Sequence, residues 1–219
     1  MTTRILCAAA LSLAAVTYPA ASLAQTGDLD AIATITKLEA PLETQIVENV
    51  DFGEVNKPNG ARPGAKCRYQ IGASAARNGE SRAEELDLSG QVVDAALPTP
   101  SMCGWGTGDE PDSFPTGVVA VYCEAGLDVQ MDASFTPAGV AGVGFSRPSG
   151  LKSLGYFDPD AQTLINDTFG TSLTTTCREF SDTAGALGVL VGAQIILDES
   201  AAETVNNIAV GTITLEFSY

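Results

Sequence analysis

The clearest pattern in the chain is a strict alternation of apolar and polar residues at its C-terminal end, over residues 211–219. One row holds Ile213, Leu215, Phe217 and Tyr219, and the other holds Thr212, Thr214, Glu216 and Ser218. A repeat of two residues, rich in β-branched and aromatic side chains, predicts a half-buried antiparallel strand. We expect the first row to point into a core and the second row to face solvent.

Shorter runs of the same kind recur along the chain, and glycine, proline and asparagine separate them. The predicted strands before the terminal one are Asp30–Leu38, Glu43–Val47, Asn49–Val55, Cys67–Ile71, Val118–Cys123, Leu127–Phe135, Leu151–Phe157, Thr171–Cys177 and Leu187–Leu197. Closely spaced strands with only weak helical periodicity predict an all-β sandwich or barrel. We expect an antiparallel β-sandwich.

Residues 74–117 interrupt this regular pattern. Arg77–Leu86 has the composition of a short helix, but most of the stretch is proline, glycine, serine and acidic residues. An irregular segment of this length is unusual in a compact domain, so we interpret it as a long inserted loop. Cys103 would fasten this loop, and Trp105, the single tryptophan, would pack at its base.

The first 24 residues have the three parts of a signal peptide. Arg4 is the charged part, Ile5–Val16 is apolar, and Ser22-Leu23-Ala24 is a small-residue cleavage signal. The apolar run is shorter than the roughly 20 residues that span a bilayer. We therefore expect export to the periplasm, the cell surface or the medium, with residues 25–219 forming one β-sandwich domain.

Charge narrows the range of partners. Without Arg4 the chain keeps 10 basic and 27 acidic residues, a net charge of −17. Nucleic acids and anionic membrane surfaces attract clusters of lysine and arginine, so neither is an expected partner. We find no second apolar run long enough for a transmembrane helix.

Four cysteines follow the leader: Cys67, Cys103, Cys123 and Cys177. An even number in an exported chain predicts two disulfides, and a zinc site is disfavoured because the chain has no CxxC and no histidine. If residues 67–73 and 117–123 pair antiparallel, Cys67 falls opposite Cys123, which leaves Cys103 for Cys177. We favour this pairing, and the alternative of Cys67–Cys103 with Cys123–Cys177 stays open.

Candidate chemistry is sparse. Without histidine, Ser-His-Asp, Cys-His and histidine–metal catalysis are excluded. Paired carboxylates could still hydrolyse glycosides, but no pair stands out among 27 acids. Asp158-Pro-Asp160 lacks the later glycine and glutamate of a calcium loop, and Asp109–Asp112 is more simply a solvated acidic loop than a calcium site. We predict no catalytic residue, no metal and no cofactor.

Three segments in order carry a resemblance to a known group of proteins. They are the run through Pro41 into Asn49-Val-Asp-Phe-Gly53, the central Val121–Met131, and the terminal Gly211–Tyr219. Together they resemble exported bacterial Ig-like β-sandwich domains, a family of unknown function similar in pattern to spore coat protein U and to chaperone–usher pilins. The 74–117 stretch and the cysteine positions depart from that pattern.

The resemblance implies a non-enzymatic structural or adhesive subunit of a fimbria or coat. Its partners would be copies of itself or other surface subunits, together with a periplasmic chaperone. Strand donation to a neighbour would have to use Asp30–Leu38, because residues 25–29 are too short and polar. The alternatives are a soluble periplasmic or secreted ligand-binding module with its site in the inserted loop, a small outer-membrane β-barrel, and an acid-pair hydrolase.

Overall fold

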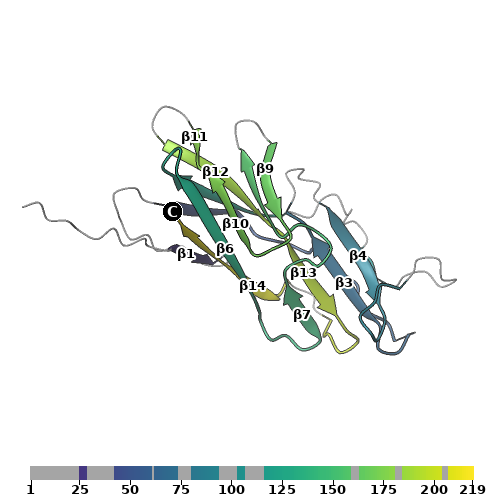
Figure 1. Ribbon diagram of the computed structural model, residues 1–219. Coiled ribbons are helices and arrows are strands. Elements are labelled where there is room, and N and C mark those ends of the chain that lie inside the picture. The colour runs from purple at the N-terminus through teal and green to yellow at the C-terminus, as the bar shows by residue number, and fades with distance from the viewer. Residues whose placement is uncertain are drawn as a thin grey trace, which may run out of the picture.

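The computed structural model describes residues 25–28, 42–60, 62–73, 80–93, 103–106, 116–158, 163–180, 184–203 and 207–219. The predicted signal peptide and the predicted strand Asp30–Leu38 lie outside these residues. The described part of the chain is all β-strand and turn, and every strand pairing in it is antiparallel (Figure 1). It contains no helix long and apolar enough to cross a membrane.

Sheet 1 has four strands in the order β1-β14-β6-β10. The bounds of its strands are β1 Gln25–Asp28, β6 Asp128–Pro137, β10 Ser172–Thr176 and β14 Gly211–Ser218. Strand β14 is the alternating C-terminal segment, and it pairs with β6 along its whole length. The prediction that this segment forms a strand is therefore confirmed.

Sheet 2 has six strands, with β2-β5-β12-β8-β9 in order and β11 beside β12. Their bounds are β2 Glu43–Glu48, β5 Gly117–Cys123, β8 Leu154–Asp158, β9 Thr163–Thr168, β11 Arg178–Phe180 and β12 Ala184–Val191. Sheet 3 has the order β4-β3-β13-β7. Its strands are β3 Lys66–Ile71, β4 Ser81–Leu86, β7 Val143–Ser146 and β13 Ala193–Leu197.

Gly192 joins sheets 2 and 3. It separates β12 from β13, which the sequence predicts as one strand. A Cβ on Gly192 would lie 2.4 Å from the backbone oxygen of Ile71, so only glycine fits where the chain bends against β3. The two sheets thus follow each other in one layer, with β11 near one end of the molecule and β4 near the other (Figure 1).

The core lies between this layer and sheet 1. The Tyr156 hydroxyl on β8 donates to the backbone oxygen of Val129 on β6 at 3.2 Å, which places the two layers face to face. Most of the buried apolar side chains belong to one cluster drawn from all three sheets, including Tyr69, Ile71, Val121, Met131, Leu187, Ile195, Leu215 and Phe217. The all-β sandwich predicted from the sequence is confirmed.

Three details of the predicted strands need correction. Tyr219 does not continue the inward row of β14: the strand ends at Ser218, the tyrosine is 41% exposed, and its hydroxyl accepts a hydrogen bond from the Glu124 amide. Asn49–Val55 is not a regular strand, and its one bridge to another described residue joins Val55 to Trp105. Strands β1, β7, β9 and β11 lie in stretches where the sequence predicts no strand.

The predicted helix at Arg77–Leu86 is also wrong for the residues that the structure describes. Residues 81–86 form β4, which pairs with β3 and so makes part of the expected loop a strand of sheet 3. Tertiary pairing outweighs local helix propensity here. Arg68 on β3 supports that pairing, because it binds Glu84 on β4 at 2.5 Å. Arg62, which precedes β3, binds Glu85 at 2.6 Å.

Candidate functional site

A groove opens at one edge of the sandwich, where the end of sheet 3 meets the start of β14. Its cavity volume is about 1310 Å³. The floor comes from β13, β7 and the start of β14, through Ile195, Leu197, Val143, Phe145 and Ile213. Two irregular segments form its walls: residues 49–60, called wall 1 below, and residues 199–203 with 207–210, called wall 2.

The floor is made of core side chains. Ile195 is 2% exposed and Ile213 is 3% exposed, so the floor is closely packed from below. Gly211 lets the ring of Phe145 lie against the first residue of β14, because a Cβ on Gly211 would come within 2.1 Å of that ring. The groove therefore ends directly on the hydrophobic core, with no polar layer between.

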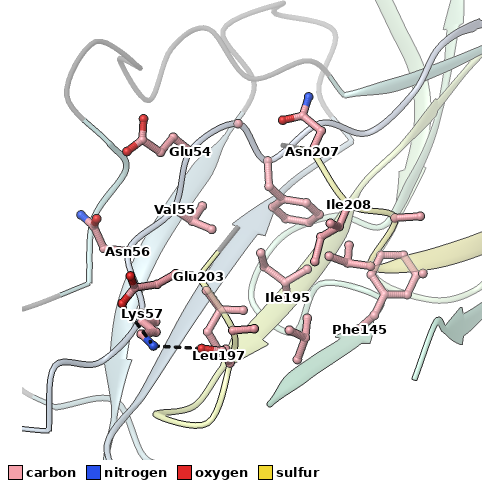
Figure 2. A pocket seen from close by; sticks show the side chains of 18 of the residues that line it. Glu54, Val55, Asn56, Lys57, Phe145, Ile195, Leu197, Glu203, Asn207 and Ile208 are labelled. Atoms are coloured by element: carbon pink, nitrogen blue, oxygen red, sulfur yellow. Dashed lines mark hydrogen bonds and ion pairs between the residues drawn. The ribbon is translucent and has the colours of Figure 1, made fainter. Parts of the chain in front are cut away.

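Apolar surface available to a ligand comes mainly from the walls. Ile208 in wall 2 is 44% exposed, and Val55 and Val210 are half-buried. Figure 2 shows the side chains of Ile208, Ile195 and Phe145 gathered inside the groove. An exposed isoleucine beside two half-buried valines is the kind of apolar surface that marks a binding site.

Wall 1 is held from its outer side. The amide of Asn56 donates to the Gly104 oxygen at 3.1 Å, and the amide of Gly106 donates to the Glu54 oxygen at 2.7 Å. Residues 103–106 are in turn fastened to β3 by the Cys67–Cys103 disulfide. Wall 1 is therefore anchored to the sheet through a covalent link, and its inner side faces the groove.

Tyr69 supports the same wall from within the core. Its hydroxyl donates to the Asn56 oxygen at 2.5 Å and accepts from the Gly104 amide at 3.1 Å. Its ring packs edge-to-face on Trp105 at 5.1 Å between centroids. Burial raises the pKa of the Tyr69 hydroxyl to about 12, against the lowering effect of its hydrogen bonds to Gly104 and Asn56, so the group stays a donor at physiological pH.

Wall 2 begins at a tight turn after β13. The carboxylate of Asp198 accepts from the Ser200 amide at 2.8 Å and from the Ser200 hydroxyl at 2.6 Å, and these bonds lower the pKa of Asp198. Lys57 reaches across from wall 1, where it donates to the Ala201 oxygen at 3.0 Å and lies 3.4 Å from Glu203 (Figure 2). This side-chain link joins the walls at one end of the groove.

The rim is acidic. Among the residues that the structure describes, four carboxylates line the groove, those of Asp51, Glu54, Glu199 and Glu203, against one lysine, Lys57. The ammonium of Lys57 is already engaged with Glu203. The groove thus combines an apolar floor with a negative rim, an arrangement that favours an apolar ligand with positive groups at its margins.

The disulfides correct the favoured pairing. They are Cys67–Cys103, with Cα atoms 5.3 Å apart, and Cys123–Cys177, with Cα atoms 6.1 Å apart. Cys67 does not face Cys123, because β3 pairs with β4 and β13 whereas β5 pairs with β2 and β12. The prediction of two disulfides is confirmed, and the alternative pairing is the one that forms.

Residues singled out from the sequence are otherwise spread through the fold. Trp105 packs at the base of the inserted stretch, as expected, while Asp109–Asp112 lies outside the described residues. No group of three or more potential metal ligands occurs among the residues that the structure describes. Sequence reasoning missed the groove. The signal that could have found it is the irregular run 49–60, where the apolar residues Val50, Phe52 and Val55 stand among charged residues, glycine, asparagine and proline.

Comparisons with models of known protein families, with curated proteins and with solved structures found no match to this chain.

Proposed function

We propose that this protein is an exported, non-enzymatic subunit of a bacterial surface structure, with a structural or adhesive role. The observation that carries the proposal is the groove, where two walls flank an opening onto the core. A sandwich that is open along one edge has a ready place to receive a segment of a neighbouring molecule. Such a contact is what a subunit of an assembly requires.

The disulfides support the exported part of the proposal. Both link segments far apart in the chain, 36 and 54 residues along the sequence. Disulfides persist in oxidising compartments such as the periplasm and the extracellular space. The leader-like residues 1–24 agree with this placement.

A second candidate is a soluble ligand-binding module of the periplasm or medium. The same groove favours it, because an exposed isoleucine above an apolar floor also suits a free ligand. The two candidates differ in whether the protein stays attached to the cell.

Fractionation of cells that produce the full chain tests the proposal. We expect the protein in the surface fraction, sensitive to protease added to intact cells, with both disulfides formed. Protein found only in the soluble periplasm or the medium would contradict the surface role and favour the binding module. Protein retained in the cytoplasm with free thiols would contradict both.

A further inference from the structure

Sheet 2 is apolar on the face that points away from the core. On β5 the side chains of Val119 and Val121 are at most 2% exposed and point inward, so the alternate residues point outward. The cross-strand register adds the outward residues of the neighbouring strands. This surface, called the outer face of sheet 2 below, consists of Gln45, Val118, Ala120, Tyr122, Phe157, Leu164, Ala186 and Gly188.

The outward residues of sheet 1 are different. On β6 they are Asp128, Gln130, Asp132, Ser134 and Thr136, which is the polar row expected where an antiparallel sheet meets solvent. The outer face of sheet 2 lacks such a row, although most of its side chains are half-buried or exposed. A contiguous apolar surface of this kind marks a contact with another molecule.

Two glycines make the outer face of sheet 2 flat. A Cβ on Gly188 would lie 3.2 Å from the ring of Phe157, and a Cβ on Gly155 would lie 2.9 Å from the Leu164 side chain. Phe157 and Leu164 therefore lie close over the backbone of the neighbouring strands. Flat apolar sheet faces pack against each other about 10 Å apart, so this face has the form to meet another sheet.

The shape of the face is complementary to itself. A two-fold axis parallel to the strands, midway between β5 and β12, places each outward residue of β5 opposite its own β12 neighbour on a second copy. Tyr122, which is 42% exposed, then faces Ala186 of the second copy. Ala120 likewise faces Gly188 of the second copy. A large side chain opposite a small one, beside two small residues, allows the sheets to pack without voids.

The charges at the margins fit the same axis. Glu43 on β2 and Arg178 on β11 stand at the two ends of the row that contains Tyr122 and Ala186. Both are exposed, and neither forms a salt bridge with another residue that the structure describes. The axis brings Glu43 of each copy opposite Arg178 of the other, which gives two attractive contacts in one dimer.

Other partners and other axes fit less well. A two-fold axis perpendicular to the strands would place Glu43 opposite Glu48 of the second copy, because both acids lie on β2. An anionic membrane surface attracts clusters of basic residues, and the margin of this face offers Arg178 beside two acids. Charge therefore favours a second copy of this chain, related by the parallel axis.

We infer that two copies of this chain form a symmetric dimer, back to back, through the outer face of sheet 2. None of the residues of this face lines the groove, so both grooves of the dimer stay open. The dimer is an interaction beyond the proposed function, and it does not depend on attachment to the cell.

Sedimentation velocity with the full, disulfide-bonded chain tests the inference. We expect a species of twice the mass of the chain to predominate at about 100 μM and to dissociate on dilution. Tyr122→Asp should weaken the dimer by at least about 30-fold, because it removes the aromatic contact and places a charge in the apolar face. Thr174→Asp adds the same charge at an exposed position of sheet 1 and should leave the dimer unchanged.

Charge reversal tests the axis itself. Glu43→Arg and Arg178→Glu should each weaken the dimer by at least about 5-fold, because each places like charges opposite one another. The double variant should restore the dimer to within about 3-fold of the original chain. Glu43→Arg makes the chain less acidic, which alone would favour association, so its weakening cannot come from net charge.

Three results would overturn the inference. They are a chain that stays monomeric at about 100 μM, a dimer that Tyr122→Asp leaves intact, and single charge reversals that the double variant does not rescue. Cell fractionation separates these failures from failure of the proposed function. A surface-attached monomer loses only the inference, and a dimer found solely in the medium loses only the surface role.

Discussion

At the scale of single residues, Tyr69 connects the core to the groove. Its hydroxyl holds the backbone of wall 1 at Asn56, and its ring packs against Trp105. It sits on β3 between Cys67 and Ile71, in a row of fully buried side chains. The Tyr69 hydroxyl is therefore a polar contact through which the packed core positions wall 1.

Alkaline pH provides a test of that contact. The hydroxyl of Tyr69 ionises near its ordinary value of 10 in the unfolded chain but only at about 12 in the folded one, mainly because burial disfavours the phenolate. Its contribution to stability is present below about pH 10 and is lost as the pH rises towards 12, since the unfolded state then binds fewer protons. Urea unfolding at a series of pH values should show this decline.

The variant Tyr69→Phe isolates the effect. It should be less stable at neutral pH, because the Asn56 oxygen loses its donor, but its stability should fall less between pH 10 and 12. An identical alkaline decline in both proteins would show that Tyr69 ionises equally easily in the folded and unfolded states.

The two disulfides differ in what they support. By loop entropy, removing either one should cost about 2–5 kcal/mol of unfolding free energy. Cys67→Ser with Cys103→Ser should also release residues 103–106 and raise the hydrogen-exchange rate of the Asn56 amide, which bonds to Gly104. Cys123→Ser with Cys177→Ser is the matched control and should leave that amide unchanged. Equal exchange at Asn56 in both variants would contradict the anchoring of wall 1.

At the scale of elements, the alternating sequence pattern predicts β14 and its buried face almost completely. Ile213, Leu215 and Phe217 are at most 3% exposed, whereas Glu216 is exposed. The repeat of two is enough to predict such a strand because one face meets the core and the other meets solvent. Tyr219 breaks the pattern only because the pairing with β6 stops at Ser218.

Phe217→Ala tests the packing of this strand. The ring is 1% exposed, so truncation should lower the free energy of unfolding by about 3–5 kcal/mol. Glu216→Gln, on the outward face of the same strand, should change it by no more than about 0.5 kcal/mol. Urea titrations of both variants measure the difference, and similar losses would place the strand outside the core.

The local sequence pattern does not predict the bend at Gly192. Residues 187–197 are almost uniformly apolar, so the sequence predicts one continuous strand. The two-strand arrangement depends on where β3 lies, and β3 is more than 100 residues earlier in the chain. The groove escaped prediction for the same reason, since β7, β13, β14 and wall 1 come together only in the folded sheet order.

Adding one methyl group at Gly192 tests whether the bend requires glycine. Gly192→Ala would place a Cβ 2.4 Å from the Ile71 oxygen and should destabilise the protein by about 1–3 kcal/mol. Gly104→Ala is the control, because a Cβ there meets nothing within 4 Å. Thermal unfolding gives the melting temperature of each variant. Equal melting temperatures would show that β12 and β13 can move away from β3 without a loss of stability.

At the scale of the whole molecule, fold class and binding site depend on different kinds of information. The sequence pattern predicts the sandwich, because each strand has an apolar face and the turns between strands are rich in glycine and proline. The cysteine pairing and the groove depend on which strands become neighbours in the sheets. The molecule that results is a covalently braced sandwich with an acidic opening along one edge.

The proposed surface role predicts that this opening is filled when the protein is in place on the cell. Hydrogen exchange followed by mass spectrometry can compare the isolated, soluble chain with the same chain in the surface fraction. We predict slower exchange at Val55–Lys57 and Ile208–Ile213 in the surface fraction, because an added strand would cover both walls, and unchanged exchange in the central strand β12. Equal exchange at the walls in both samples would contradict the groove as the contact of a surface subunit.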